Sequence, residues 1–469
     1  MGGGVALKPA VMIRDQLADY LTQHGLSINQ FAIRSGINSG TLSRIINGHQ
    51  PIAMSHLELI TAGMGLGEDF FYSLYVEECF YYSAPTWRRL RPFIVKCAEL
   101  GRTDCIELLV QNLLDNLTYV PMLYEVAEGL FQQGHWPAAA LLYENVSASE
   151  KYQYSERLAT CQYRLFQIAL GDDQSTNLRA ATLFESYIPR LNEADQLDGL
   201  KDLMHVYYTL QLWNKVNELA IELLRLATIR YDLYCNPKYK EAVKSGERPL
   251  CFYILYAHLM RSNVYEEYGD YKKALELVPL YSDVDWIHEE SEEAKRTVTQ
   301  FQEWGKANTY LYRLLDGQLE VLDDYVNYIS TQQGEIFTAL FYIVKSANLY
   351  NWSVDSVLER FSDYMPYRIH LNEFGAYNQQ IKADQHARFL VELGVYYLRN
   401  SRSEGIGYIL RSLESSSKLN NESMIFKCVD LFEQNRHIAG EDEQMQYKIL
   451  IKEVRDANEK KTHINASLV

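Results

Sequence analysis

The sequence predicts an all-α protein in which a small helical head precedes a long array of stacked helix pairs. The first sign is the segment from Ser27 to Gly48, where a helix, a tight glycine turn and a second short helix follow one another. The second is a pattern of two helices per unit that recurs beyond residue 90. The third is composition: 47% of the 469 residues are apolar, and the 25 glycines and 11 prolines form no long flexible linker, which is typical of an ordered, mostly helical chain.

The head segment carries the residues that begin and end two helices. The Ser27 hydroxyl is expected to cap the first helix, and Gly36 is expected to supply the left-handed conformation at the turn. Either Asn38 or Ser39 can cap the second helix. Amphipathic segments before and after this pair bring the head to about five short helices around one small core.

The second helix turns its apolar residues inward and leaves a polar face free. That face consists of Ser39, Gly40, Thr41, Ser43 and Arg44. Over residues 11 to 75 the segment resembles the lambda-repressor-like XRE family of helix-turn-helix domains, whose usual order is matched by Gly36, Thr41, Ser43, Arg44, Asn47 and Gly48. The resemblance implies that this face, together with Asn38, contacts a double-stranded DNA operator. A helix pair kept only for packing or dimerisation is the alternative.

The first helix of the pair departs from the family at one position. The family commonly places a phosphate-contacting glutamine just after the cap, whereas this chain has Ile28, and Gln30 is the candidate to replace that contact after a rotation. The head is also not basic, since residues 1 to 75 contain four lysines and arginines against five acidic residues. Counterion release from so few cations gives little affinity per copy, so a homodimer with recognition helices about 34 to 36 Å apart is expected.

The net charge of −16 lies almost wholly beyond the head. Because an acidic body repels nucleic acid, only the head is expected to touch DNA. The exception is Arg88, Arg89 and Arg91 beside Trp87, which fit a solvated helix start or, as the less favoured alternative, a phosphate contact.

The sequence contains no sign of an enzyme, a metal site or a membrane anchor. There is no nucleotide-binding glycine loop, no His-Glu-x-x-His motif and no nucleophile elbow, so neither catalysis nor a cofactor is expected. The seven cysteines contain no Cys-x-x-Cys pair and predict free thiols in helix cores. Residues 1 to 10 lack the apolar core of a signal peptide, and no run of about 18 apolar residues exists, which predicts a cytoplasmic protein without membrane contact.

Helix pairs of the body share a pattern of glycine, aromatic residue and alanine. In the clearest pair, Gly269 is expected to make the turn, Tyr271 to wedge between the helices and Ala274 to let them approach. Residues 130–139 repeat these offsets, and residues 393–397 match the first half of the pattern. Weaker copies occur around Gly101, Trp213, Gly317 and Trp352. These pairs resemble tetratricopeptide repeats, which stack into a right-handed α-solenoid because each pair buries its open face on its neighbour.

An XRE-type head on a tetratricopeptide-like body resembles the RRNPP family of bacterial peptide-pheromone receptors. The resemblance implies a helix-turn-helix domain over residues 1–75, a linker helix region over 76–95, and a repeat domain for peptide binding and dimerisation over 96–469. It also implies a quorum-sensing transcription regulator that is switched by a short imported signalling peptide. The rival interpretation is a repeat-based regulator that binds a folded partner, such as a response regulator or an anti-repressor, with stimulation of aspartyl-phosphate hydrolysis as one form of it.

The peptide groove of such a body is expected along the first helix of each pair. Counting back from the turns places nine candidates on that inner face: His205, Tyr208, Tyr256, Asn263, Glu267, Asn308, Tyr312, Asn348 and Arg388. Glu266 is the alternative to Glu267. Asn263 is the leading candidate, since an asparagine amide pairs with both the N–H and the C=O of a peptide backbone; a solvated groove residue is the alternative. Arg388 suits a peptide carboxylate, with a surface ion pair as its commoner role.

Overall fold

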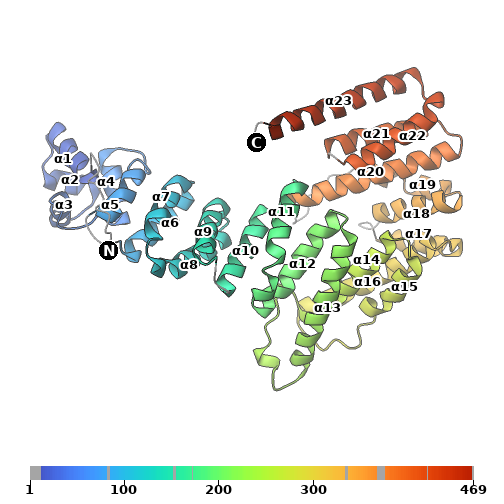
Figure 1. Ribbon diagram of the computed structural model, residues 1–469, viewed down its shortest axis with the longest axis horizontal. Helices are drawn as coiled ribbons and strands as arrows, with labels where there is room; N and C mark the ends of the chain where they lie inside the picture. Colours follow the sequence, from blue (N-terminus) through green and yellow to red (C-terminus); the bar gives the residue numbers. More distant parts are fainter. Residues whose placement is uncertain are drawn as a thin grey trace. The chain divides into compact units, whose positions relative to one another are not determined.

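The computed structural model describes residues 12–81, 85–151, 155–171, 173–332, 336–366, 375–419 and 421–466, with the backbone alone at residues 81, 375–382 and 457–466. All regular secondary structure in these residues is helical, in the order α1 to α23, with short 3-10 turns between some helices (Figure 1). The all-α prediction is therefore confirmed. The expectation about a signal peptide concerns residues 1 to 10, which lie outside the described part of the chain.

The chain divides into two compact units. Unit 1 comprises residues 1–169 and 182–192, and unit 2 comprises residues 170–181 and 193–469. The boundary runs through α11 (Gln174–Glu185), whereas the boundaries predicted at residues 75 and 95 both lie inside unit 1. Among the helices of the described residues, none combines the length and the apolar character that a membrane span requires.

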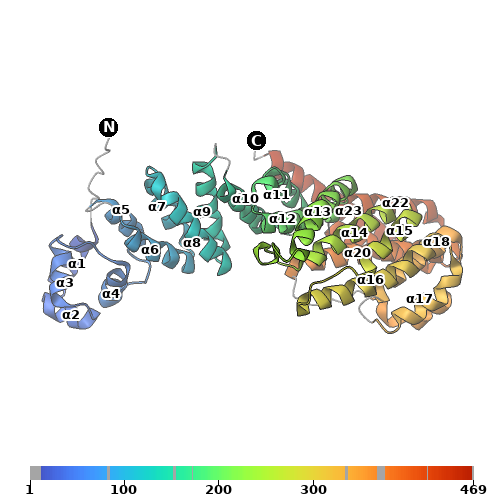
Figure 2. The same ribbon diagram turned by 90° about the horizontal axis from the view of Figure 1, so that it is seen from below.

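Unit 1 begins with five short helices and continues with antiparallel neighbours (Figure 2). The short helices are α1 (Ile13–Gln23), α2 (Ile28–Ser35), α3 (Ser39–Ile46), α4 (Met54–Met64) and α5 (Tyr72–Tyr81). They are followed by α6 (Trp87–Glu99), α7 (Thr103–Leu113), α8 (Val120–Gln132), α9 (Trp136–Ser149) and α10 (Glu156–Ala169). One hydrophobic cluster runs from Ile13 on α1 to Cys161 on α10. Helices this short are marginal by themselves in water, so they depend on this shared core.

Local side chains set the ends of α2 and α3. The Ser27 hydroxyl accepts the Gln30 N–H at 3.3 Å, and the Gln30 side-chain oxygen accepts the Ser27 N–H at 2.8 Å, which forms a capping box. Gly36 ends α2 with a φ of 76°, a conformation that disfavours side chains with a Cβ. The Asn38 side-chain oxygen accepts the N–H groups of Gly40 and Thr41 at 2.9 and 3.3 Å. Asn38, rather than Ser39, is therefore the cap of α3.

Two buried arginines connect the short helices of unit 1. Arg14 on α1 pairs with Glu78 on α5 at 2.7 Å, and both side chains are only 4% exposed. Arg89 on α6 is 8% exposed and donates a hydrogen bond to the Cys79 carbonyl oxygen at 2.5 Å. The expectation that Arg89 belongs to a solvated helix start was wrong. The physical reason is that the carbonyl at the end of α5 satisfies a guanidinium that would be costly to bury alone.

Unit 2 continues the chain as consecutive helices that pack on one another. The first are α12 (Glu193–Thr209), α13 (Trp213–Cys235), α14 (Leu250–Glu267), α15 (Tyr271–Ser282), α16 (Glu292–Leu315) and α17 (Leu322–Ile329). They are followed by α18 (Ile336–Tyr350), α19 (Asp355–Arg360), α20 (Gly375–Arg399), α21 (Glu404–Lys418), α22 (Glu422–Asn435) and α23 (Glu441–Ala466). From α12 to α16, each helix contacts the next one along the chain.

The hairpin of α14 and α15 follows the predicted pattern. Gly269 lies at the turn with a φ of 75°, and Ala274 is fully buried between the two helices. The Ser262 hydroxyl on α14 donates to the Ala274 carbonyl oxygen at 2.9 Å, which shows how closely the helices approach. Overpacking a buried contact of this kind is costly, which favours a small residue such as alanine at this crossing.

The hairpin of α20 and α21 is closer still, because glycines face each other at the crossing. A Cβ atom added to Gly405 would lie 2.6 Å from Leu398 Cγ and 2.7 Å from the Gly394 carbonyl oxygen. The same addition at Gly407, two residues along α21, would meet nothing within 4 Å. Gly405 and Gly407 thus lie on the same helix, but only Gly405 is in close contact with α20.

We expect Gly405→Ala to lower the free energy of unfolding by about 1 to 3 kcal/mol, because the helices must separate to admit the methyl group. Gly407→Ala should instead raise it by up to about 1 kcal/mol, through helix propensity alone. Denaturant unfolding of the two variants, followed by circular dichroism, measures both effects. Equal shifts in the same direction would show that the helices do not meet at Gly405.

Candidate functional site

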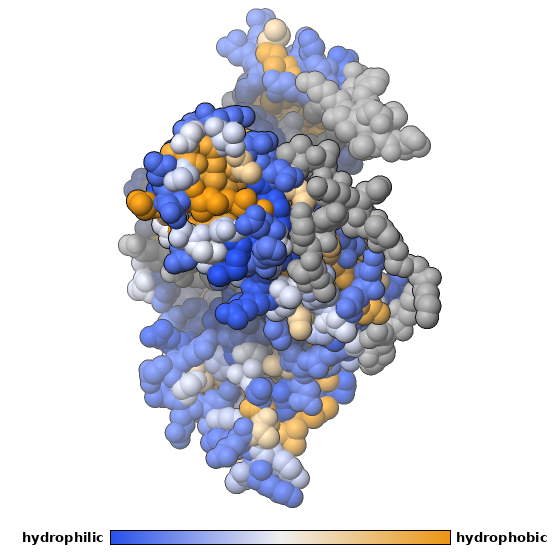
Figure 3. Space-filling view, turned by 90° about the vertical axis from the view of Figure 1, so that its left-hand side faces the viewer, coloured by the Kyte–Doolittle hydropathy of each residue, from blue (hydrophilic) through white to orange (hydrophobic). Residues whose placement is uncertain are grey.

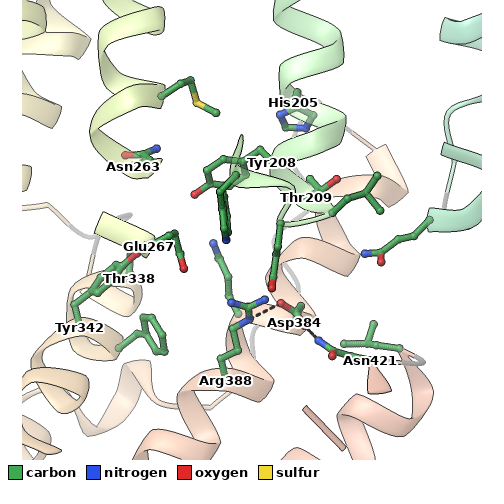
Figure 4. A pocket seen from close by; sticks show the side chains of 18 of the residues that line it. His205, Tyr208, Thr209, Asn263, Glu267, Thr338, Tyr342, Asp384, Arg388 and Asn421 are labelled. Carbon is green, nitrogen blue, oxygen red and sulfur yellow. Dashed lines mark hydrogen bonds and ion pairs between the residues drawn. The ribbon is translucent and has the colours of Figure 1, made fainter. Parts of the chain in front are cut away.

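Unit 2 contains a cavity of about 730 Å³. Its walls come from α11, α12, α14, α18 and α20, from the turn between α12 and α13 with the start of α13, and from the turn between α21 and α22 with the start of α22. Helices far apart in the sequence therefore meet at one space (Figure 4). The aromatic side chains that line it are Tyr208, Trp213, Tyr256, Phe337, Phe341 and Tyr342.

Six of the nine residues predicted for a peptide groove line this cavity. His205 and Tyr208 come from α12, Tyr256, Asn263 and Glu267 from α14, and Arg388 from α20. Figure 4 shows Tyr208, Glu267 and Arg388 turned toward the same space. Of the two alternatives on α14, Glu267 lines the cavity and Glu266 is buried behind it, 6% exposed.

The other three predicted residues lie outside the cavity lining and make contacts within the fold. Asn308 donates to the Tyr281 hydroxyl at 3.0 Å. Tyr312 is fully buried, and its hydroxyl lies 3.4 Å from the Asn263 side-chain oxygen. Asn348 donates to the carbonyl and the carboxylate of Glu392, both at 2.9 Å. The polar groups of these three residues therefore join neighbouring helices. Asn308 and Tyr312 lie on α16, which contributes no residue to the cavity lining, and Asn348 bonds to α20.

Sequence reasoning missed one wall of the cavity, which α18 supplies. Phe337, Phe341 and Lys345 line it at intervals of four residues, and Tyr342 lies beside them. This spacing is that of a single helix face and was available in the sequence. Counting back from Trp352 reached only Asn348, which lies further along the same face of the helix and outside the cavity lining.

Arg388 is held in place by its neighbours. Its Nε lies 2.7 Å from Asp384 Oδ2, and Asp384 Oδ1 accepts the Asn421 amide at 2.6 Å. When the Gln211 amide is oriented by its hydrogen bonds, its oxygen accepts from the Arg388 guanidinium. Of the two roles weighed for Arg388, the structure shows the ion pair. The Arg388 guanidinium is already paired with the carboxylate of Asp384.

Glu266 is an unusual carboxyl, because it is buried directly behind the cavity wall. Burial raises its pKa to about 7, and the neighbouring Glu267 adds to the rise. Hydrogen bonds with the Tyr342 and Tyr312 hydroxyls and the charge of Lys345 oppose that rise without cancelling it. The carboxyl is therefore partly protonated near neutral pH.

The head presents a second candidate surface on α3. Gly40 and Arg44 are exposed, and Ser39, Thr41 and Ser43 are half-buried. Arg44 Nε donates to the Gln50 side-chain oxygen at 3.0 Å, and its Nη2 donates to the Thr41 hydroxyl at 3.3 Å. These bonds hold the guanidinium on the outer face of the helix, where it remains accessible.

The other candidate of the head, Gln30, is exposed on α2. Its side-chain oxygen also accepts a hydrogen bond from the Ser27 hydroxyl at 2.9 Å, which holds the side chain against the start of its own helix. Figure 3 views the molecule from the side on which α1 to α3 lie and shows apolar residues gathered on part of this face. Ile33 on α2 is 85% exposed. This apolar surface was not predicted from the sequence.

No family model and no curated protein matches this chain. Within the described residues, no three His, Cys, Asp or Glu side chains lie close enough together to hold a metal ion. All seven cysteines are free thiols, and only Cys235 is exposed. Any functional conclusion therefore depends on the geometry of the cavity and of α3.

The raised pKa of Glu266 makes stability depend on pH. The folded chain holds the proton up to about pH 7, while the unfolded chain releases it near the ordinary value of 4.5. The free energy of unfolding should therefore fall as pH rises from 4.5 to 7, by on the order of 3 kcal/mol. Glu266→Gln removes this dependence, so the variant should gain stability relative to the parent between pH 5 and pH 8. Denaturant midpoints of the parent and the variant at pH 5 and pH 8 measure this gain, and Glu276→Gln, at an exposed residue, is the control. The same stability difference between Glu266→Gln and the parent at both pH values would show that Glu266 does not have a raised pKa.

Proposed function

We propose that this chain is a DNA-binding transcription regulator whose DNA affinity is switched by a short signalling peptide held in the cavity of unit 2. The proposal follows the resemblance to the RRNPP receptors. The observation that carries it is the convergence of His205, Tyr208, Tyr256, Asn263 and Glu267, predicted from the sequence as groove residues, on one cavity together with Arg388. Residues on three separate helices share this space, as a ligand site requires.

The chemistry of the cavity suits a peptide. Its volume of about 730 Å³ lies within the range of roughly 300 to 1,000 Å³ that ligand pockets occupy. Aromatic side chains offer apolar area, and Asn263 offers both a donor and an acceptor for a peptide bond. The lining thus combines apolar surface with many polar groups, which together can orient a flexible ligand.

The head supports operator binding through α3 in a homodimer. Within residues 12–75 the exposed cations are Arg34 and Arg44, because Arg14 is buried in its pair with Glu78. Two exposed cations in the described part of each head give little affinity for the phosphate backbone. A second copy doubles the contacts and places two recognition helices on successive major grooves.

Coupling between cavity and DNA requires only that the peptide prefer one conformation of the protein. A ligand shifts a conformational equilibrium by no more than its difference in affinity for the two states. We propose that the peptide favours one arrangement of the repeat helices and so changes how the two heads meet the operator. Either direction, release or tighter binding, satisfies this mechanism.

Arg44→Ala should weaken binding to a duplex selected by the parent protein from a random pool. If the guanidinium contacts a base, the binding free energy should fall by on the order of 1 to 3 kcal/mol. If it contacts a phosphate, the slope of log K against log salt concentration should decrease in magnitude by about one. Thr41→Ala, which removes the hydroxyl that Arg44 contacts, should also weaken binding. Mobility shifts at several salt concentrations measure both, and Arg225→Ala, an exposed arginine on α13, is the control. Unchanged shifts for both head variants would reject α3 as the reading helix.

Asn263→Ala should weaken the binding of a peptide, selected from a synthetic pool by the parent protein, by about 1 to 3 kcal/mol, because a desolvated backbone group loses its partner. Asn308→Ala makes the same change outside the cavity lining and should leave the affinity unaltered. Calorimetry measures both, and neither variant should alter DNA binding in the absence of peptide. Equal peptide affinity for the parent and the Asn263 variant, or selection of no peptide at all, argues against the proposed site.

A further inference from the structure

The cavity of unit 2 carries carboxylates that the protein does not neutralise. Asp384 is fully engaged, since it pairs with Arg388 at 2.7 Å and accepts the Asn421 amide at 2.6 Å. Glu267 and Glu422 also line the cavity, and neither forms an ion pair with any residue that the structure describes. The cavity thus presents two carboxylates without a counter-ion.

Carboxylates outnumber cations in the lining, because Glu267, Asp384 and Glu422 face only Lys345 and Arg388. Lys345 acts on Glu266, where its charge opposes the rise in the pKa of that buried carboxyl. Arg388, the other lining cation, is held by Asp384 and Gln211. The lining therefore carries an excess of negative charge, in a partly enclosed space where charges interact more strongly than in bulk water.

Aromatic rings line the same cavity as Glu267, and one of them lies near its carboxylate. Burial and the charges of Glu266 and Glu267 raise the pKa of the Tyr208 hydroxyl, so this ring lies in the field of both carboxylates. Tyr256 lies about two helical turns before Asn263 on the same helix, and both line the cavity with Glu267. Figure 4 shows Tyr208 and Glu267 facing one another across open space. Ring faces together with a carboxylate are the surroundings that bind organic cations.

We infer that the cavity selects a cationic peptide, and that Glu267 holds an ammonium or guanidinium group of that peptide against the Tyr208 ring. The inference rests on the proposed function, because it names the class of peptide that the cavity takes. A guanidinium or ammonium supplies the missing counter-ion, forms a charge-assisted hydrogen bond with the carboxylate and stacks on the aromatic face. An anionic peptide would meet a lining in which carboxylates outnumber cations.

The test uses the full chain and three pools of synthetic heptapeptides, random except for one fixed central residue: arginine, norleucine or glutamate. All are acetylated and amidated, so the fixed side chain is the only systematic charge. Fluorescence of Trp213 and the other tryptophans reports binding. The arginine pool should bind roughly tenfold more tightly than the norleucine pool, and the glutamate pool more weakly than either.

Variants at one position then identify the carboxylate. Glu267→Gln should abolish the preference for the arginine pool, and Glu267→Lys should reverse it in favour of the glutamate pool. Glu276→Gln is the matched control, because it makes the same change on an exposed residue of α15 and should leave the preference intact. Pools with a free amino terminus distinguish the source of the cation: a tenfold gain on removing the acetyl group, lost in Glu267→Gln, assigns the site to the terminal ammonium.

Equal binding of all three acetylated pools, with no gain from a free amino terminus, would overturn the inference while leaving a peptide receptor intact. A preference that survives in Glu267→Gln would overturn the assignment to Glu267. Failure of every pool to bind the parent protein would overturn the proposed function and the inference with it.

Discussion

The helical hairpins reverse through single residues with a positive φ, and this constraint decides which face each helix turns to its neighbour. The positions are Gly101, Gly134, Gln211, Gly269, Gly317, Asn351 and Ser401. One left-handed residue brings the second helix back antiparallel to the first, and the pair then has an apolar face that only the next pair can cover. The burial of Ala274 against α14 and the approach of Gly405 to Gly394 are consequences of this packing. So is the cavity, since the helices that line it are held in register by these turns.

Features set by neighbouring residues could be predicted from the sequence. The capping of α2 by the Ser27 hydroxyl, the left-handed Gly36 and the turn at Gly269 depend on a few adjacent residues, and the structure bears out all three. The groove residues of α12 and α14 were found in the same way, by counting back from a turn. The turns at Gln211, Asn351 and Ser401 carry weaker signals, because a residue with a Cβ adopts this conformation only at a cost of about 1 kcal/mol that its surroundings must offset.

What depends on distant parts of the chain could not be predicted. Counting from a turn says which face of α16 carries Asn308, but the packing of α15 decides that this face meets Tyr281 instead of the cavity. Arg89 had the sequence of a solvated helix start, yet the end of α5 covers it. The boundary within α11 has the same origin, since a core shared from α1 to α10 is invisible to any local pattern.

The central claim is that a ligand in the cavity and DNA on α3 are coupled through one protein. Coupling of this kind is reciprocal: if peptide changes the affinity for DNA by some factor, DNA must change the affinity for peptide by the same factor. Calorimetric titration of one selected peptide into the protein, first alone and then saturated with its selected duplex, measures this directly. The account predicts two different dissociation constants whose ratio equals the change in DNA affinity caused by the peptide. Identical constants with and without DNA would contradict it.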